Sequence, residues 1–179
     1  MLSAALRLIG IACIVGGTST YGFWLSGRYS GNLAELEQLR HMIFLLKGQI
    51  LYANAPLHEA FETVGRRTEG YLAELFIRVS ERTQQQQGES FAEIWKAEVE
   101  QLGQENDVSL LSKADRQSLA ALGDHLGFLD REMQERNLLL YLEQLDLRIQ
   151  DMREHKKERC HLCASLGVMS GLFLAILLI

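Results

Sequence analysis

The stretch that decides the fold is DREMQERNLLLYLEQLDLRIQDMREHKKERCHLCASLGVMSGLFLAILLI, residues 130–179. It contains no proline, and no glycine before Gly167, so nothing breaks a helix over most of its length. Apolar residues alternate at spacings of four and three, which is typical of one buried seam: Leu138, Leu142, Leu145, Ile149 and Met152. From residue 160 onward no Asp, Glu, Lys or Arg appears. The pattern predicts one helix of about 50 residues, roughly 75 Å long, passing from a bundle into a membrane.

A second charge-free run covers residues 8–26 and lies between Arg7 and Arg28. A helix rises about 1.5 Å per residue and the hydrocarbon core is about 30 Å thick, so both runs are long enough to span it. We therefore predict transmembrane helices at 8–26 and 160–179. The alternative for each run is a buried helix of a soluble core.

These spans divide the chain into three parts: 1–28, an amino-terminal transmembrane helix with its flanks; 29–159, a helical domain; and 160–179, a carboxy-terminal transmembrane helix. Only Arg7 lies outside the first span, whereas most basic residues near the span ends lie between the spans: Arg28, Arg40, Arg148, Arg153, Lys156, Lys157 and Arg159. Because positive charge accumulates on the cytoplasmic side, we expect the central domain to face the cytoplasm.

The central domain reads as all-α, a bundle of about five to six helices, because the chain has one proline and no alternating strand pattern. A first helix over about 33–52 carries an apolar seam of Leu36, Leu39, Ile43, Leu46 and Ile50. Ala55-Pro56 ends it, and Pro56 suits the first turn of a short helix that fades near Gly70.

Further helices are predicted from the residues that mark helix starts and ends. Ser90 with Glu93, and Ser112 with Asp115, are capping-box patterns, each of which predicts a helix start. Between them, 84–88 and 103–108 are polar and predict loops. The second capping box opens a short helix that Gly123 and Gly127 are expected to close.

No motif predicts catalysis or a cofactor. Cys160-His161-x-Cys163 with His155 suggests a metal site, but adjacent residues on a helix point in different directions, so packing is the preferred interpretation. The chain has no recognisable carboxylate pair and no Gly-rich phosphate loop. Its net charge of −5 argues against a nucleic-acid partner.

Small and aromatic residues mark the predicted spans. Gly167 and Gly171 form a small-residue face, for which Gly16 and Gly17 of the first span are the expected packing partner. A second group is expected to anchor the helices at the membrane interface: Trp24, Arg28, Tyr29, Lys156, Lys157 and Arg159.

Three segments carry a resemblance: LEQLRHMIFLLKGQILYANAPLHEAF (36–61), LGDHLGFLD (122–130) and SLGVMSGLFLAILLI (165–179). In order and spacing they resemble the stage III sporulation protein AB family. The matching segments include the turn residues Pro56, Leu126, Gly127 and Asp130.

The resemblance implies a subunit of the channel apparatus between mother cell and forespore in endospore-forming bacteria, in the mother-cell membrane around the forespore. It also implies a domain similar to the inner-membrane platform protein of type II secretion and type IV pilus systems. By that analogy the partner is a cytoplasmic ATPase, stage III sporulation protein AA, with other stage III proteins and further copies of the chain as other candidates. Two alternatives remain: a membrane-tethered sensor or regulator, and a true secretion platform protein, which would carry two related domains.

Overall fold

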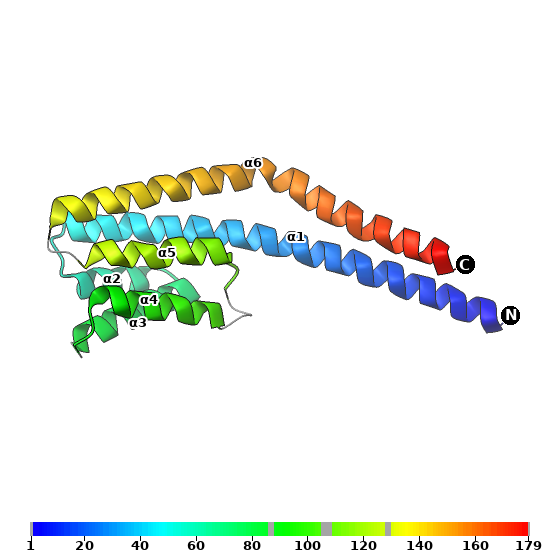
Figure 1. Cartoon of the computed structure of the whole chain (residues 1–179), viewed down its shortest axis with the longest axis horizontal. Coiled ribbons are helices and arrows are strands. Elements are labelled where there is room, and N and C mark those ends of the chain that lie inside the picture. Colours follow the sequence, from blue (N-terminus) through cyan, green and yellow to red (C-terminus); the bar gives the residue numbers. More distant parts are fainter. Residues whose placement is uncertain (1, 86–87, 105–108, 128–129, 179) are drawn as a thin grey trace. The chain divides into compact units, whose positions relative to one another are not determined.

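The computed structural model describes residues 2–85, 88–104, 109–127 and 130–178. Within these ranges the side chains of 2–19, 21–23, 25–26, 103–104, 157–164, 166–168 and 170–178 lie outside the described set. The described residues form helices and connecting turns, in agreement with the all-α prediction (Figure 1). The helices are α1 (Leu2–Leu51), α2 (Leu57–Arg67), α3 (Tyr71–Gln85), α4 (Phe91–Gln104), α5 (Lys113–Leu126) and α6 (Arg131–Leu178).

Two helices are far longer than the rest. α6 runs for 48 residues, which confirms the prediction of one uninterrupted helix. α1 runs for 50 residues, so the prediction that a separate helix begins near residue 33 was wrong. The segment between the charge-free run and the seam contains Gly27 and Gly31 but no proline. A glycine inside a helix costs only about 1 kcal/mol, and the neighbouring turns hold the helix through both positions.

The chain divides into two compact units. One comprises Met1–Leu33 and Gln150–Ile179, and the other comprises Ala34–Ile149. Among the described residues, no helix offers a stretch both long and apolar enough to cross a membrane. Most side chains of the predicted spans, 8–26 and 160–179, lie outside the described set.

Within the unit Ala34–Ile149, α1 and α6 run antiparallel. The Arg40 guanidinium of α1 pairs with the Asp146 carboxylate of α6, and Arg131, at the start of α6, donates to the Ile50 carbonyl near the end of α1, at 3.0 Å. The predicted seams are buried on both helices: Leu36, Leu39, Ile43, Leu46 and Ile50 on α1, and Leu138, Leu142, Leu145 and Ile149 on α6. Figure 1 shows this part of α1 running alongside the first half of α6.

The short helices begin and end close to their sequence signals. Both capping boxes are present: the Glu93 amide donates to Ser90 Oγ at 3.3 Å, and the Asp115 amide to Ser112 Oγ at 3.1 Å. Pro56 is the residue that precedes α2, one position before the predicted first turn. Gly70 connects α2 to α3 with a φ of +85°, which a side chain would make costly.

The prediction that Gly123 helps to close α5 was wrong, because Gly123 lies inside the helix and Gly127 alone follows its end. The reason is packing. A Cβ atom at Gly123 would lie 2.1 Å from Cδ1 of Trp95, so only glycine lets α5 approach the indole ring. The Trp95 indole also donates to the Leu119 carbonyl at 2.7 Å.

An aromatic cluster fills the core between the short helices. The Phe61 ring centroid lies 4.9 Å from that of Phe76, 5.4 Å from Phe91 and 5.3 Å from Trp95. Phe61, Phe76 and Trp95 are fully buried. Tilted and edge-on contacts of this kind add about 0.5–1.5 kcal/mol per pair beyond the burial of apolar area. Burial and ring geometry therefore join α2, α3 and α4 into one layer.

Candidate interaction surface

A buried carboxylate attaches the loop before α5 to α1. Glu35 accepts hydrogen bonds from the Leu110 amide, at 2.9 and 3.1 Å to its two oxygens, and from the Tyr71 hydroxyl. Burial and the bond to Glu35 raise the pKa of Tyr71, so its hydroxyl stays protonated and remains a donor. The Glu35 carboxylate thereby joins α1, the start of α3 and the loop before α5, which are distant from one another in sequence.

A second carboxylate attaches α5 to α6. Asp115 completes the capping box at the start of α5, and its Oδ1 lies 3.4 Å from Nε of Arg148. Burial, followed by the negative charge of Asp115, raises the pKa of Tyr141 on α6. At the other end of the pair, Gln134 Nε2 donates to the Leu126 carbonyl at 2.8 Å. These contacts define an antiparallel register for α5 and α6.

A third carboxylate, Glu98, is buried between α3 and α4. Its two oxygens accept from Arg78 and Arg82, each at 2.9 Å, and Arg82 also donates to Glu89 at 2.7 Å. A buried charge of this kind is tolerated because both oxygens are satisfied. Glu35, Asp115 and Glu98 thus all have structural partners, and none is positioned as a catalytic group.

The outer face of α6 is apolar and exposed. Met133, Leu140 and Leu147 recur every seven residues and are 52%, 50% and 64% exposed. They share one face, because seven residues are nearly two helical turns, and at about 100° per residue this face lies opposite Leu138 and the rest of the buried seam. A shallow hollow of about 320 Å³ on α6 is lined by Glu132, Glu135, Arg136, Leu139, Leu140 and Glu143. We call this surface, from Met133 to Leu147, the α6 crest.

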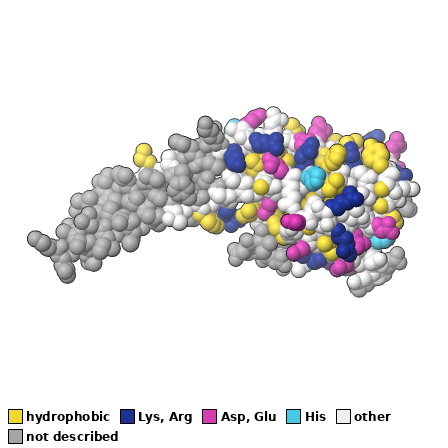
Figure 2. Space-filling model, turned by 180° about the vertical axis from the view of Figure 1, so that it is seen from behind, with side chains coloured by type: hydrophobic (Ala, Val, Ile, Leu, Met, Phe, Trp, Pro, Cys, Tyr) yellow, Lys and Arg dark blue, Asp and Glu magenta, His cyan; other side chains and the backbone are white. Residues whose placement is uncertain are grey.

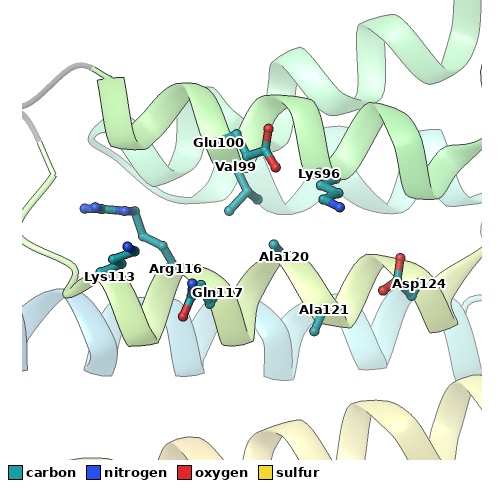
Figure 3. A pocket seen from close by; sticks show the side chains of 9 residues that line it. All are labelled: Lys96, Val99, Glu100, Lys113, Arg116, Gln117, Ala120, Ala121 and Asp124. Atoms are coloured by element: carbon teal, nitrogen blue, oxygen red, sulfur yellow. The ribbon is translucent and has the colours of Figure 1, made fainter.

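A groove lies between α4 and α5, with a volume of about 480 Å³. Figure 3 shows Val99, Ala120 and Ala121 along its middle, Lys113 and Arg116 toward one end, and Asp124 toward the other. Its remaining lining residues are Lys96, Glu100 and Gln117. We call it the α4/α5 groove. Lys113 and Arg116 line it from the start of α5 and Asp124 from near the end of α5, while α4 contributes Lys96 and Glu100, so charges of both signs line the groove.

A smaller hollow of about 210 Å³ lies between α5 and α6 and includes His125, Asn137 and Tyr141 among its lining residues. Of the side chains that the structure describes, the Asn137 amide nitrogen and the Tyr141 hydroxyl are buried here without a hydrogen-bond partner. A hollow of this size accommodates water, which would satisfy both groups.

Charges are otherwise intermixed. On the face shown in Figure 2, Lys and Arg side chains alternate with Asp, Glu and apolar ones over the described surface. Nucleic-acid binding requires a basic stripe, and the face in view offers none.

The turn residues singled out in the sequence surround the junctions before α2 and α6. Leu126 is fully buried, and Gly127 follows it at the end of α5. The Asp130 carboxylate accepts from the Glu132 amide at 3.1 Å, which starts α6. Pro56 is exposed. These residues lie at chain reversals, and Asp130 also lines a shallow hollow of about 450 Å³.

The structure describes the side chains of only some of the residues that were predicted to anchor the helices at the membrane interface. Trp24 is 53% exposed, and the Arg28 guanidinium lies 5.1 Å from its ring. The Tyr29 hydroxyl donates to the Met152 carbonyl at 3.2 Å, a bond between α1 and α6 that the aromatic pattern did not predict. Lys156 is exposed. The remaining predicted residues lie outside the described side chains: Gly16, Gly17, Lys157, Arg159, Gly167 and Gly171.

No group of three or more His, Cys, Asp or Glu side chains suited to a metal ion occurs among the described residues. Cys160, His161 and Cys163 lie outside that set. The sequence also missed Glu35, the α6 crest and the α4/α5 groove. The crest had a visible signal, since Leu140 and Leu147 are apolar residues outside the seam, whereas the groove had none.

Comparison with known proteins decides the family. The family model described as stage III sporulation protein AB matches residues 7–179. The chain belongs to this family. It is therefore a member of a family of sporulation proteins, as the resemblance of the three segments predicted.

Two relatives support the assignment. Stage III sporulation protein AB of Bacillus subtilis (strain 168) is 27% identical over 173 residues, which cover 97% of this chain and 99% of the relative. A solved structure of stage III sporulation protein AB matches with a TM-score of 0.63 at 23% identity, covering 72% of this chain and 98% of that chain. The structural match shows the same fold.

Proposed function

We propose that this protein is a non-catalytic, membrane-anchored subunit of the sporulation channel complex between mother cell and forespore, and that it couples a cytoplasmic ATPase to the membrane assembly. The observation that supports this most is the continuity of α1 and α6. Each long helix contains a buried seam within Ala34–Ile149 and, beyond it, a charge-free run at 8–26 or 160–179.

Both charge-free runs have the length and composition of membrane spans. With basic residues concentrated between them, the domain faces the mother-cell cytoplasm in this proposal. An uninterrupted helix transmits a displacement along its axis without bending, whereas a flexible linker absorbs it. Two such helices, joined at Arg40–Asp146 and at Tyr29–Met152, would connect the domain mechanically to the membrane.

The coupling is tested by kinking α6 at an exposed position. Gln150→Pro removes a helical hydrogen bond and places the ring against the preceding turn, at a cost of about 3 kcal/mol. We expect the variant to remain in the membrane fraction but to abolish sporulation when it replaces the native gene in its host. Gln150→Ala is the matched control. Rigid coupling is wrong if both variants sporulate equally well.

The partner is tested by pull-down with the full chain in mild detergent from sporulating cells. We expect recovery of a secretion-type ATPase, with stage III sporulation protein AA as the candidate. A channel subunit should also recover other stage III proteins. Recovery of neither class would contradict the proposal.

A membrane-tethered sensor is the second candidate. The unpartnered Asn137 and Tyr141 groups in the hollow between α5 and α6 favour it, because a small polar ligand could satisfy them. In that case the pull-down should recover a kinase or transcription component in place of the ATPase.

A further inference from the structure

We propose that the α6 crest is a docking surface for a basic amphipathic helix of a partner protein. The docked helix carries apolar residues at a spacing of about seven residues, with Lys or Arg beside them. This inference stands on the surface of the unit Ala34–Ile149 alone. It does not depend on the proposed coupling to an ATPase, and it holds whichever protein supplies the helix.

The crest carries an exposed apolar stripe. Met133, Leu140 and Leu147 are each at least half exposed and recur every seven residues, so the stripe is about 21 Å long at 1.5 Å per residue. Leu139, which is also exposed, widens the stripe near its middle. Apolar residues that recur every seven positions are the pattern by which one helix packs along another. A partner helix with the same spacing therefore covers the stripe along its whole length.

The flank of the crest that faces α1 is acidic. The hollow of about 320 Å³ and the hollow of about 450 Å³ adjoin there, because Glu132 and Glu135 line both. Counted in full, the charged lining residues of the two hollows are four carboxylates and two guanidinium groups, a net charge of −2: Asp130, Glu132, Glu135, Glu143, Arg131 and Arg136. Leu51 and Tyr52, at the end of α1, supply apolar surface beside these charges.

The basic residues at this flank do not cancel its acidity. Arg131 donates to the Ile50 carbonyl at 3.0 Å and to the Asn54 side chain, so it is held within the chain. Lys47 of α1 lines neither hollow, and its amine lies 5.6 Å from the centroid of the Phe44 ring. Opposite charges attract across an interface and like charges are costly, so the acidic flank selects a basic partner. The same charge disfavours nucleic acid and an anionic membrane surface.

The flank that faces α5 differs in kind. The hollow of about 210 Å³ on that side has no carboxylate, Lys or Arg among its lining residues, and Asn137 and Gln144 line it from α6. These two residues alternate with Met133, Leu140 and Leu147 at spacings of four and three, which is the full pattern of a helix–helix seam.

Asn137 supplies the register of that seam. Among the described side chains, its amide nitrogen is buried without a hydrogen-bond partner. An Asn inside an apolar seam costs stability, but it fixes which residues of the two helices lie opposite each other. A docked helix that presents a polar side chain to Asn137 satisfies the amide and is held in one register.

Designed helical probes test the chemistry of the partner. The full chain in a mild non-ionic detergent is titrated with a fluorescent peptide of about three heptads, with leucine at heptad spacing and lysine beside it. Two matched probes carry glutamate in place of lysine, or serine in place of leucine. We expect the leucine–lysine probe to bind at least tenfold more tightly than either matched probe. Equal binding of the lysine and glutamate probes overturns the proposal.

Variants of the crest test the place of binding. Glu132→Gln combined with Glu135→Gln should weaken the leucine–lysine probe at least threefold, and added salt should reduce the difference. Glu74→Gln combined with Glu81→Gln removes the same charge from exposed positions of α3 and is the matched control. An equal loss in the control pair shows attraction to the overall negative charge and overturns the site.

Photo-cross-linking of the full chain in its sporulating host tests the occupant itself. A benzophenone amino acid replaces Leu140, and the same replacement at Gln101, exposed on α4, is the control. We expect an adduct at position 140, at least fivefold above the control, whose cross-linked peptide from another protein is basic and has apolar residues at heptad spacing. An adduct with a second copy of this chain overturns the proposal. An acidic peptide, or no adduct above the control, also overturns it.

Discussion

The two long helices and the four short ones are held in place by different means. α1 and α6 meet along apolar seams, with ion pairs such as Arg40–Asp146 at the exposed margin. α2 to α5 are held by a buried aromatic cluster, by close approach at Gly123 and by two capping boxes. On the long pair, α6 has leucines that are exposed to solvent. In the short layer, by contrast, the Gly123 backbone packs directly against the Trp95 ring. The short layer thus depends on ring packing and close helix approach, whereas the long pair depends on its apolar seams.

The largest effect is expected from Trp95→Ala. It removes a fully buried ring from the aromatic cluster together with the bond to the Leu119 carbonyl, at a cost of about 3–5 kcal/mol. Urea unfolding of the full chain in detergent, followed by circular dichroism, measures it. Lys96→Ala, next in sequence but exposed, should change the free energy of unfolding by less than about 0.5 kcal/mol. Equal effects would show that the core does not depend on this ring.

A smaller loss is expected from Glu35→Ala, which tests the junction between the two regions. The Leu110 amide and the Tyr71 hydroxyl lose their carboxylate acceptor in a buried site, at a cost of about 2–3 kcal/mol. Hydrogen exchange at residues 109–112 should accelerate together with the loss of stability. Tyr71→Phe, which removes one partner only, should cost about 1 kcal/mol. Unchanged exchange would mean that the carboxylate does not hold the loop.

The stability of the protein should be much less sensitive to loss of the ion pair between α1 and α6. A double-mutant cycle with Arg40→Ala and Asp146→Ala should give a coupling of about 0.2–1 kcal/mol, because both side chains are partly exposed. The coupling should decrease with added salt. A value above about 2 kcal/mol would show that ion pairs, as well as the seam, hold α1 to α6, and would remove the contrast between the regions.

The smallest effect concerns the cap of α4 and depends on pH. Hydrogen bonds from the Ser90 amide and hydroxyl lower the pKa of Glu93 below its ordinary value. A lowered folded-state pKa stabilises the protein above the unfolded pKa, about 4.3 for Glu, and that contribution is lost as the pH falls through the folded value. Glu93→Ala should therefore lower Tm slightly at pH 7 and leave it unchanged in strong acid. Gln101→Ala, exposed on the same helix, should show no pH-dependent difference.

Local signals predicted α6, both capping boxes and the apolar seams, because helix periodicity and caps depend only on residues within one or two turns. They failed for α1, where the seam predicted a separate helix beginning near residue 33 although the helix is continuous from Leu2 to Leu51. They failed again at Gly123, which looks like a helix end until Trp95 of another helix is placed against it.

Some features of the candidate interaction surface can likewise be predicted from the sequence, and others cannot. The leucines of the crest can be recognised in the sequence as apolar residues that do not belong to the seam. Their spacing of seven residues places them on one face of any α-helix. The α4/α5 groove, the burial of Glu35 and the pairing of Asp115 with Arg148 are not visible there, since each joins segments separated by many residues. Periodicity along one helix decides which side chains share a face. Only the packing of helices decides which faces meet and which stay exposed.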